Sequence, residues 1–238
     1  MILTTRIALF CLVTYLSFPL CAQSSPPGSR HWQMSVGAQY TQGRATNSFS
    51  AQPLEAFSYG GNMEYVLTLP KLTMTFSIYA GLQQIRAEGK DIVTPAFFDL
   101  EETLRIDNLI FGPGLELKLN NKGKYHPLIG AQAFWGGAVN SEYNFEDTAM
   151  VGVFINSVPT NFQVKGGAGL YNGGQVFAGL ERVLTEKIQL RVKGALGGHY
   201  QFATWNFPFP VLPFYTFRNA QLIRGGYWQA SVEVIHRL

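Results

Sequence analysis

The stretch Ile188-Gln189-Leu190-Arg191-Val192-Lys193-Gly194-Ala195-Leu196 decides the fold of this chain, because apolar residues alternate in it with polar or small ones. Successive side chains of a β-strand point to opposite faces. One face is then aliphatic, with Ile188, Leu190, Val192 and Leu196. The other face is polar or small, with Gln189, Arg191, Lys193 and Ala195. The stretch is predicted to be a strand that separates an apolar environment from a polar one.

Eight segments of the chain show this alternation, and their polar faces are rich in Gly, Ser, Thr and Gln with isolated charges. The predicted strands are 32–41, 57–69, 72–86, 103–119, 125–138, 175–184, 187–201 and 224–237. Tight turns at 69–71, 120–124 and 185–186 alternate with long connections near 42–56, 87–102, 139–174 and 202–223. This order is typical of membrane barrels, whose strands need about 9–11 residues to cross a bilayer. The chain is predicted to be all-β, an eight-stranded antiparallel up-and-down transmembrane β-barrel.

The N-terminus has the features of an export signal. Arg6 precedes the apolar run 7–13, and Leu20-Cys21-Ala22 offers a cleavage region. Residues 1–22 are therefore predicted to be a cleaved signal peptide, 23–31 a short periplasmic segment and 32–238 the barrel. A membrane helix and a lipoprotein anchored at Cys21 are the alternatives. Because both cysteines lie in 1–22, the mature chain is expected to have no disulfide and no thiolate metal site.

Composition narrows the classes of protein further. Charged residues make up 14% of the chain, well below the roughly 25% of soluble proteins. No apolar run after the signal segment reaches the roughly 20 residues of a membrane helix. The net charge of +3 is spread out, which argues against a nucleic-acid partner. Motifs for a nucleotide, a metal or another cofactor are not found, so none is expected, and lipid of the membrane is the expected surrounding partner.

The inward face is predicted to hold a network of paired charges. An eight-stranded barrel is just wide enough inside for its own side chains, and an unpaired buried charge is costly. The predicted lumen charges are Glu64, Arg105, Glu116, Lys118, Glu181, Arg191, Lys193 and Glu233. Arg191 and Glu233 are expected at similar depth on adjacent strands, as a pair. The network is interpreted as structural, with a narrow selective pore as the alternative.

His199 is the histidine whose position suggests chemistry, since the strand phase points it inward near the outer mouth. The segment Gly197-Gly198-His199-Tyr200-Gln201 loosely resembles the His-aromatic-Ser-Asn segment of the lipid A deacylase family. Gln201 stands where that family has its nucleophilic Ser, so Ser-His catalysis lacks its nucleophile. His199 is predicted to be a hydrogen-bonded lumen residue, and no catalytic residue is assigned.

The connection 202–217 has an unusual composition for a loop in water, being rich in Phe and Pro, and 150–155 is also apolar. Exposed apolar patches usually mark an interface or a ligand groove. The candidate interface residues are Phe207, Phe209, Phe214 and Tyr215. The two connections are expected either to cap the barrel or to bind an outer-membrane or cell-surface protein partner or an apolar ligand.

Together, the signal segment, the eight alternating strands, the turn and loop order and the Gly and aromatic content resemble the small outer-membrane β-barrel family, of OmpA/OmpX or PorT-like type. The C-terminal Leu238 departs from the aromatic residue with which many of these barrels end. The resemblance implies an integral outer-membrane protein, expected to be non-enzymatic with loops that cap the barrel or dock a partner. A lipid A-modifying enzyme with His199 near the mouth and a carrier of a small apolar ligand are the alternatives.

Overall fold

The computed structural model describes residues 28–46, 51–90, 100–119, 123–147, 161–166, 169–208 and 216–238. They form antiparallel strands: β1 (Arg30–Thr46), β2 (Ala51–Thr68), β3 (Thr73–Lys90), β4 (Leu100–Lys118), β5 (Tyr125–Asp147), β6 (Asn161–Lys165), β7 (Leu170–Val183), β8 (Ile188–Pro208) and β9 (Thr216–Arg237). None of the described residues forms a helix that is long and apolar enough to cross a membrane. The predicted signal peptide, 1–22, lies outside the described residues, and β1 begins two residues before the predicted start.

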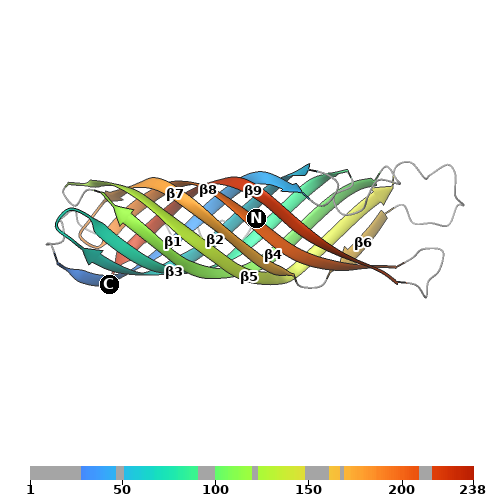
Figure 1. Ribbon diagram of the computed structural model, residues 1–238, viewed down its shortest axis with the longest axis horizontal. Helices are drawn as coiled ribbons and strands as arrows, with labels where there is room; N and C mark the ends of the chain where they lie inside the picture. Colours follow the sequence, from blue (N-terminus) through green and yellow to red (C-terminus); the bar gives the residue numbers. More distant parts are fainter. Residues whose placement is uncertain are drawn as a thin grey trace, which may run out of the picture.

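All strands except β6 close into a barrel (Figure 1). Neighbours pair in the order β4-β3-β2-β1-β9-β8-β7-β5, and β4 also pairs with β5, which completes the ring of eight. The short strand β6 pairs with β5 from Glu142↔Lys165 to Glu146↔Asn161, beyond the end of the β5–β7 ladder at Gly137↔Leu170. In a closed ring every strand has a partner on both sides, which is the condition for a sheet in lipid. The predicted fold class, an eight-stranded antiparallel barrel, is confirmed.

The two ends of the barrel differ. One end carries the tight turns and the C-terminus, and we name it the turn end; the opposite end is the loop end (Figure 1). Gly123, in the turn between β4 and β5, has a φ of 96°, a left-handed conformation that glycine adopts without a steric cost. At the turn end the observed strand boundaries lie within two residues of the predicted ones.

At the loop end the predicted boundaries were wrong. The strands run three to nine residues further than predicted, so that parts of the predicted long connections 42–56, 87–102, 139–174 and 202–223 are strand. The longest strand, β5, has 23 residues, about twice the number that a bilayer requires. The prediction ended each strand where the outward apolar alternation ends. That point marks the edge of the lipid, whereas the hydrogen-bonded ladder continues beyond it.

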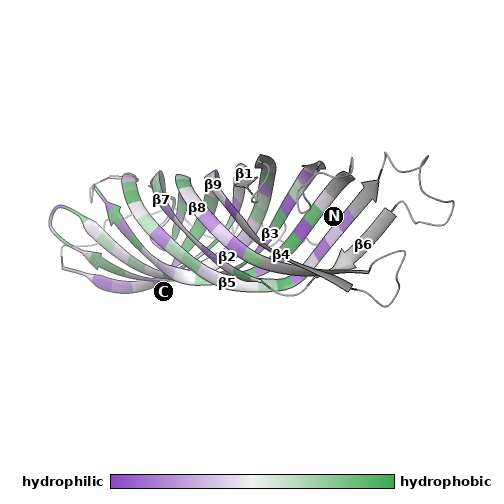
Figure 2. Ribbon diagram, turned by 45° about the vertical axis from the view of Figure 1, so that its right-hand side comes forward, coloured by the Kyte–Doolittle hydropathy of each residue, from purple (hydrophilic) through white to green (hydrophobic). Residues whose placement is uncertain are grey.

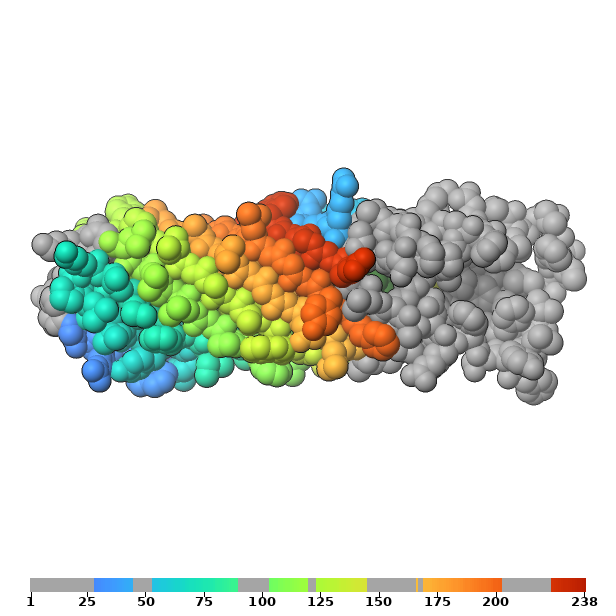
Figure 3. All heavy atoms as spheres, viewed as in Figure 1, coloured from blue at the N-terminus to red at the C-terminus, as the bar shows by residue number. Residues whose placement is uncertain are grey.

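The outer face near the turn end is an apolar belt. Exposed residues such as Ile78, Phe111, Val176 and Leu196 are 54% to 68% accessible, as lipid-facing side chains are. Figure 3 shows the strands crossing the visible face as oblique, adjoining bands. Rings also pair across strands on this face: Trp32 with Tyr65 at 5.2 Å and Tyr40 with Trp228 at 5.9 Å between centroids. Such rings with a polar edge favour the membrane interface.

Toward the loop end the two faces exchange character. On β4, Leu115 lies outside and Glu116 inside, but further along the same strand Arg105 lies outside and Ile106 inside. The other buried apolar residues of β2, β3 and β4 beyond the belt are Leu54, Ala56, Ile85, Ala87 and Leu104. We name the belted part the membrane half and the remainder the loop half. Figure 2 shows apolar and polar residues alternating along the strands.

A β-bulge in β5 lies at the boundary between the halves. Asp107 of β4 pairs with Asn140, whereas Asn108 pairs with Ala138, so Val139 is the extra residue. The bulge moves the inward phase of β5 from even to odd numbers: Phe134 is buried before it, and Tyr143 after it. Without the extra residue, Tyr143 would point outward.

Candidate functional site

The lumen of the membrane half is filled by ion pairs centred on Arg191. Its Nη1 lies 2.9 Å from Glu64 Oε1 and 3.1 Å from Glu233 Oε2. Its Nη2 lies 3.0 Å from Glu181 Oε2 and 3.2 Å from Glu116 Oε1. These side chains come from β2, β4, β7, β8 and β9, so the guanidinium ties together most of the ring. The predicted Arg191–Glu233 pair is present, as cross-strand neighbours.

Two lysines complete this group. Lys118 Nζ lies 2.7 Å from Glu181 Oε2. Lys193 pairs with Glu233 and also lies 4.7 Å from the centroid of the Phe177 ring. We name the charged plug by its members: Glu64, Glu116, Lys118, Glu181, Arg191, Lys193 and Glu233. All of them are buried. The plug fills this level of the lumen, which an eight-stranded barrel leaves only wide enough for side chains.

Seven of the eight predicted lumen charges therefore lie together, and the prediction was wrong for Arg105. That side chain is 47% exposed on the outer face of the loop half, where it pairs with Asp107 at 3.3 Å. The outer face there is polar, so a charge on it needs no partner inside. Without Arg105, the plug has four carboxylates against three cations. Glu116 is the least engaged acid: its Oε1 pairs with Arg191 alone and accepts no hydrogen bond from the described residues, whereas Glu233 pairs with both Arg191 and Lys193.

Above the plug, toward the loop end, lies a layer of rings: Tyr79, Phe134, Tyr171, His199 and Tyr227. The His199 ring stacks on Tyr171 at 5.7 Å and lies 5.8 Å from Tyr227. Tyr79 meets Phe134 edge-on at 5.7 Å. Two of these rings lie close to glycines of the wall: a Cβ on Gly197 would be 2.5 Å from Tyr227 Cζ, and one on Gly81 would be 2.6 Å from Tyr79 Cζ. We name this group the aromatic layer. It marks the upper limit of the charged region.

Amide side chains connect the aromatic layer to the next level. Asn108 and Gln201 exchange two hydrogen bonds: Asn108 Nδ2 donates to Gln201 Oε1 at 3.2 Å, and Gln201 Nε2 donates to Asn108 Oδ1 at 2.6 Å. Asn108 Nδ2 also reaches Gln83 Oε1 at 3.4 Å, and Gln83 Nε2 reaches the hydroxyl of Tyr171 at 3.4 Å. Most of the polar atoms of this amide group are thus occupied by one another.

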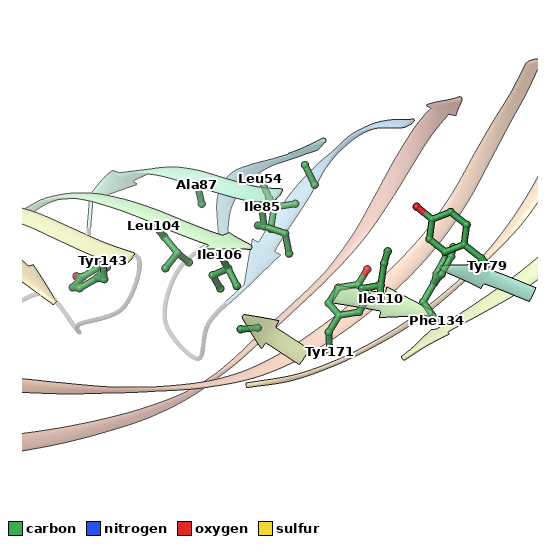
Figure 4. Packing of buried hydrophobic residues seen from close by; sticks show 12 residues of the cluster. Leu54, Tyr79, Ile85, Ala87, Leu104, Ile106, Ile110, Phe134, Tyr143 and Tyr171 are labelled. Carbon is green, nitrogen blue, oxygen red and sulfur yellow. The ribbon is translucent and has the colours of Figure 1, made fainter. Parts of the chain in front are cut away.

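Beyond the amide group the lumen is apolar. Figure 4 shows Leu54, Ile85, Ala87, Leu104, Ile106 and Tyr143 gathered in one group, with Ile110, Phe134, Tyr79 and Tyr171 in a second. We name the first group the apolar lumen. Its members come from four consecutive strands, and each is at most 3% accessible. These side chains form a buried apolar cluster, in which an unpaired charge would be costly.

Another part of the wall, between β5, β7, β8 and β9, has a shallow groove of about 890 Å³ on its outer face. Its floor includes Gly174 and Gly198, which are paired across β7 and β8. The exposed rings of Trp135 and Tyr200 stand at its edge. The groove is mostly apolar and lies within the belt, where lipid chains contact the wall.

The structure describes only some of the remaining predicted residues. Phe207 belongs to β8, where its backbone pairs with Phe217, while Phe209, Phe214 and Tyr215 lie outside the described residues, as does 150–155. Their predicted role as an interface stays a prediction.

In the described part of the chain, no group of three or more His, Cys, Asp or Glu could hold a metal ion. His199 is buried and faces inward, as predicted. Its Nε2 has no partner among the described residues, so this nitrogen does not make the predicted hydrogen bond.

Comparison with known proteins leaves the family open. No family model and no curated protein matches the chain. Neisserial surface protein A (NspA) is 12% identical, over 87% of this chain and 98% of that one, with a TM-score of 0.35. Ail, the attachment invasion locus protein of Yersinia pestis, is 10% identical over 88% and 99%, with a TM-score of 0.32. The outer membrane protein AlkL is 11% identical over 94% and 98%, with a TM-score of 0.38.

These similarities are to the fold alone, so the class of the protein rests on the barrel itself. A closed ring of eight strands with an apolar belt outside and a charged plug inside is an integral β-barrel of the outer-membrane type. The narrower resemblance to the OmpA/OmpX or PorT-like type stays a prediction.

Proposed function

We propose that this protein is a non-enzymatic outer-membrane barrel that binds small apolar molecules in the apolar lumen of its loop half. The turn end faces the periplasm and the loop end faces outward, since short turns are periplasmic in such barrels. The proposal includes export through a cleaved signal peptide, residues 1–22. Among the functions that the sequence leaves open, it favours the carrier of an apolar ligand.

The observation that carries this proposal is the exchange of character between the two halves of the wall. A loop half with a water-filled lumen would be expected to have polar residues on its inner face. Here Leu104 and Ile106 are 2% and 0% accessible, whereas Arg105 between them is exposed. An apolar inner face inside a polar outer face is the arrangement that holds an apolar molecule in a watery surrounding.

The charged plug supports the same proposal from the other side. It occupies the lumen below the aromatic layer with paired charges that are buried. A straight water-filled path through the barrel would require these ion pairs to separate. The proposed barrel therefore conducts no ions and keeps its ligand in the upper lumen.

Catalysis is not part of the proposal. His199 is flanked by the rings of Tyr171 and Tyr227, and Gln201 lies two residues further along β8 with its amide bonded to Asn108. The amide of Gln201, which stands where the lipid A deacylase family has its Ser, is not a nucleophile for acyl transfer. Docking of a protein through Phe207, Phe209, Phe214 and Tyr215 remains a separate prediction, and it is compatible with ligand binding in the apolar lumen.

Equilibrium dialysis with naphthalene tests the proposal. The purified barrel in lipid nanodiscs should take up more naphthalene than empty nanodiscs of the same lipid. Ile106→Glu places a charge inside the apolar lumen and should weaken binding by roughly tenfold or more. Thr103→Glu is the matched control, since Thr103 is exposed on the outer face of the same strand. Equal uptake by nanodiscs that contain the barrel and by empty nanodiscs would refute the proposed function.

A further inference from the structure

We propose that the turn end of the barrel binds anionic phospholipids, through a ring of exposed cations that contacts their phosphate groups. We name this group the turn-end cations: Arg30, Lys71, Lys124, Arg182 and Lys187. The inference does not depend on a ligand in the apolar lumen, because it concerns the outer surface at the opposite end of the barrel.

The exposed charge of the turn end has one sign. All of the turn-end cations are exposed, and Glu186 is the one exposed carboxylate among the described residues at this end. The nearest acids on the strands, such as Glu181 and Glu233, are buried in the charged plug. None of the turn-end cations forms an ion pair with a described residue. Such an excess of exposed positive charge favours an anionic partner.

The outer face toward the loop end is different, because its charges are mixed. Among the side chains that the structure describes there, the exposed cations are Arg44, Arg86, Arg105 and Arg224, and the exposed or half-buried acids are Glu55, Glu88, Asp107 and Glu142. Two of them, Arg105 and Asp107, pair at 3.3 Å. The excess of cations is therefore a property of the turn end and not of the whole outer surface.

Aromatic rings indicate the depth of the turn-end cations in the membrane. Arg30 lies two positions before Trp32 on the outer face of β1, and Trp32 packs against Tyr65 at 5.2 Å. Arg182 lies opposite Tyr125 in the β5–β7 ladder, with its Cζ 5.6 Å from the centroid of that ring. Exposed rings with a polar edge favour the boundary between hydrocarbon and headgroups, and long cationic side chains extend from there to the headgroups. The cations therefore lie at the level of the lipid phosphates.

The turn-end cations also lie on several sides of the barrel. Arg30 begins β1, Lys71 lies between β2 and β3, Lys124 precedes β5, Arg182 belongs to β7 and Lys187 precedes β8. These strands are spread over the ring order β4-β3-β2-β1-β9-β8-β7-β5. A protein partner contacts one compact patch with apolar and aromatic residues at its centre, whereas lipids surround the whole wall. Since guanidinium and ammonium groups both bind phosphate, we assign this surface to anionic phospholipid.

Spin-labelled lipids test the preference in phosphatidylcholine vesicles that contain the intact barrel. The fraction of label immobilised at the wall is compared between phosphatidylglycerol, which is anionic, and phosphatidylcholine, which has no net charge. At about 0.01 M salt the native barrel should bind the anionic lipid roughly 2- to 5-fold more tightly. Salt at about 1 M shortens the screening length from about 30 Å to about 3 Å and should bring the two lipids close to equality.

A triple variant assigns the preference to the turn end. Arg30→Gln, Lys124→Gln and Arg182→Gln together leave two turn-end cations against Glu186, and should bring the two labelled lipids close to equality at low salt. The charge-retaining triple, Arg30→Lys, Lys124→Arg and Arg182→Lys, should keep the native preference. Each variant is first shown to be folded by its heat-modifiable gel mobility.

The matched control removes the same charge from the loop half. Arg44→Gln, Arg86→Gln and Arg105→Gln together should leave most of the native preference, because these cations are accompanied by acids. An equal loss in this variant and in the turn-end variant would place the preference in the net charge of the whole barrel, and would overturn the assignment to the turn end.

Two further outcomes would refute the proposal. The first is equal association of both labelled lipids with the native barrel at low salt. The second uses polyglutamate as a mimic of an acidic protein: if the barrel in neutral micelles binds polyglutamate but shows no lipid preference in vesicles, the turn end is a protein surface instead. The binding of naphthalene is measured separately, so failure of this proposal leaves the proposed function intact.

Discussion

The membrane half and the loop half of this barrel use one set of strands in opposite ways. Along β4, Leu115 faces lipid and Glu116 faces the plug, and ten residues earlier Arg105 faces outward and Ile106 is buried. The phase of the strand is the same at both places, and only the surroundings differ. Lipid outside the wall demands apolar residues there and leaves the inside to polar ones, whereas water outside reverses the assignment. The point at which the inner lining changes from polar to apolar therefore indicates how far the lipid extends along the barrel.

The largest expected effect comes from removing the centre of the plug. Arg191→Met leaves four buried carboxylates with only two lysines, and should lower the free energy of unfolding by about 3–5 kcal/mol or prevent folding. Urea titration in detergent micelles, followed by gel mobility, measures the loss. Glu116→Gln is the matched control: it removes the least engaged acid and balances the charges, so it should be close to neutral. A loss in Glu116→Gln as large as in Arg191→Met would contradict this description of the plug.

A second test of the plug removes Glu233 from the Arg191–Glu233 pair. In the structure, Arg191 keeps three other carboxylates when Glu233 is lost, so the cation left without its ion-pair partner is Lys193. Glu233→Gln should therefore cost about 1–3 kcal/mol. Adding Lys193→Met should restore part of it. Additive losses in the double variant would show that the two residues do not interact.

The next prediction tests directly whether the outer faces of the two halves have different surroundings. Leu115→Arg places a charge in the lipid-facing belt and should cost about 2–4 kcal/mol near the middle of the bilayer. Thr103→Arg makes a similar change on the outer face of the loop half and should cost less than about 0.5 kcal/mol. Unfolding in lipid vesicles measures both. Similar costs at the two positions would mean that lipid surrounds the loop half as well.

A smaller effect is expected where rings lie against glycine. Gly197→Ala brings a methyl group within contact of Tyr227 and should cost about 1–3 kcal/mol through overpacking. Gly194→Ala on the same strand faces open space and should cost little. Replacing Tyr227 by Leu together with Gly197→Ala should recover stability. Failure to recover would place the strain in the backbone rather than at the ring.

The smallest expected effect concerns the outer face of the loop half. Burial alone would raise the pKa of Asp107, but hydrogen bonds from Gln84 and Asn140 and the nearby Arg105 outweigh it and lower the pKa. Its stabilising contribution is therefore full above the ordinary Asp pKa of about 3.9 and is lost as the pH falls through the lowered value. Because the site is partly exposed, Asp107→Asn should change stability by less than about 1 kcal/mol. The difference between native and variant should vanish once the pH is well below the lowered pKa of Asp107, and a difference that persists in strong acid would exclude titration of Asp107.

The sequence by itself determined the features that depend on a two-residue period. The alternation in each segment predicted eight strands, the inward phase of the membrane half and seven members of the plug. The turn residues near 69–71, 120–124 and 185–186 set the strand boundaries at the turn end. Depth counted along adjacent strands predicted the Arg191–Glu233 pair. All of these are local or next-neighbour properties of a sheet.

Only the tertiary structure decided what meets across the lumen and where the lipid ends. Arg191 reaches Glu64, 127 positions away in the chain, because strand tilt and ring closure bring β2 and β8 to one level. The bulge at Val139 moves Tyr143 inside, and no residue type announces it. The inward assignment of Arg105 went against the two-residue period of β4, which points Arg105 outward as it does Leu115. Its exposure shows that β4 extends beyond the bilayer, and the length of the ladder, unlike its period, depends on partners far along the chain.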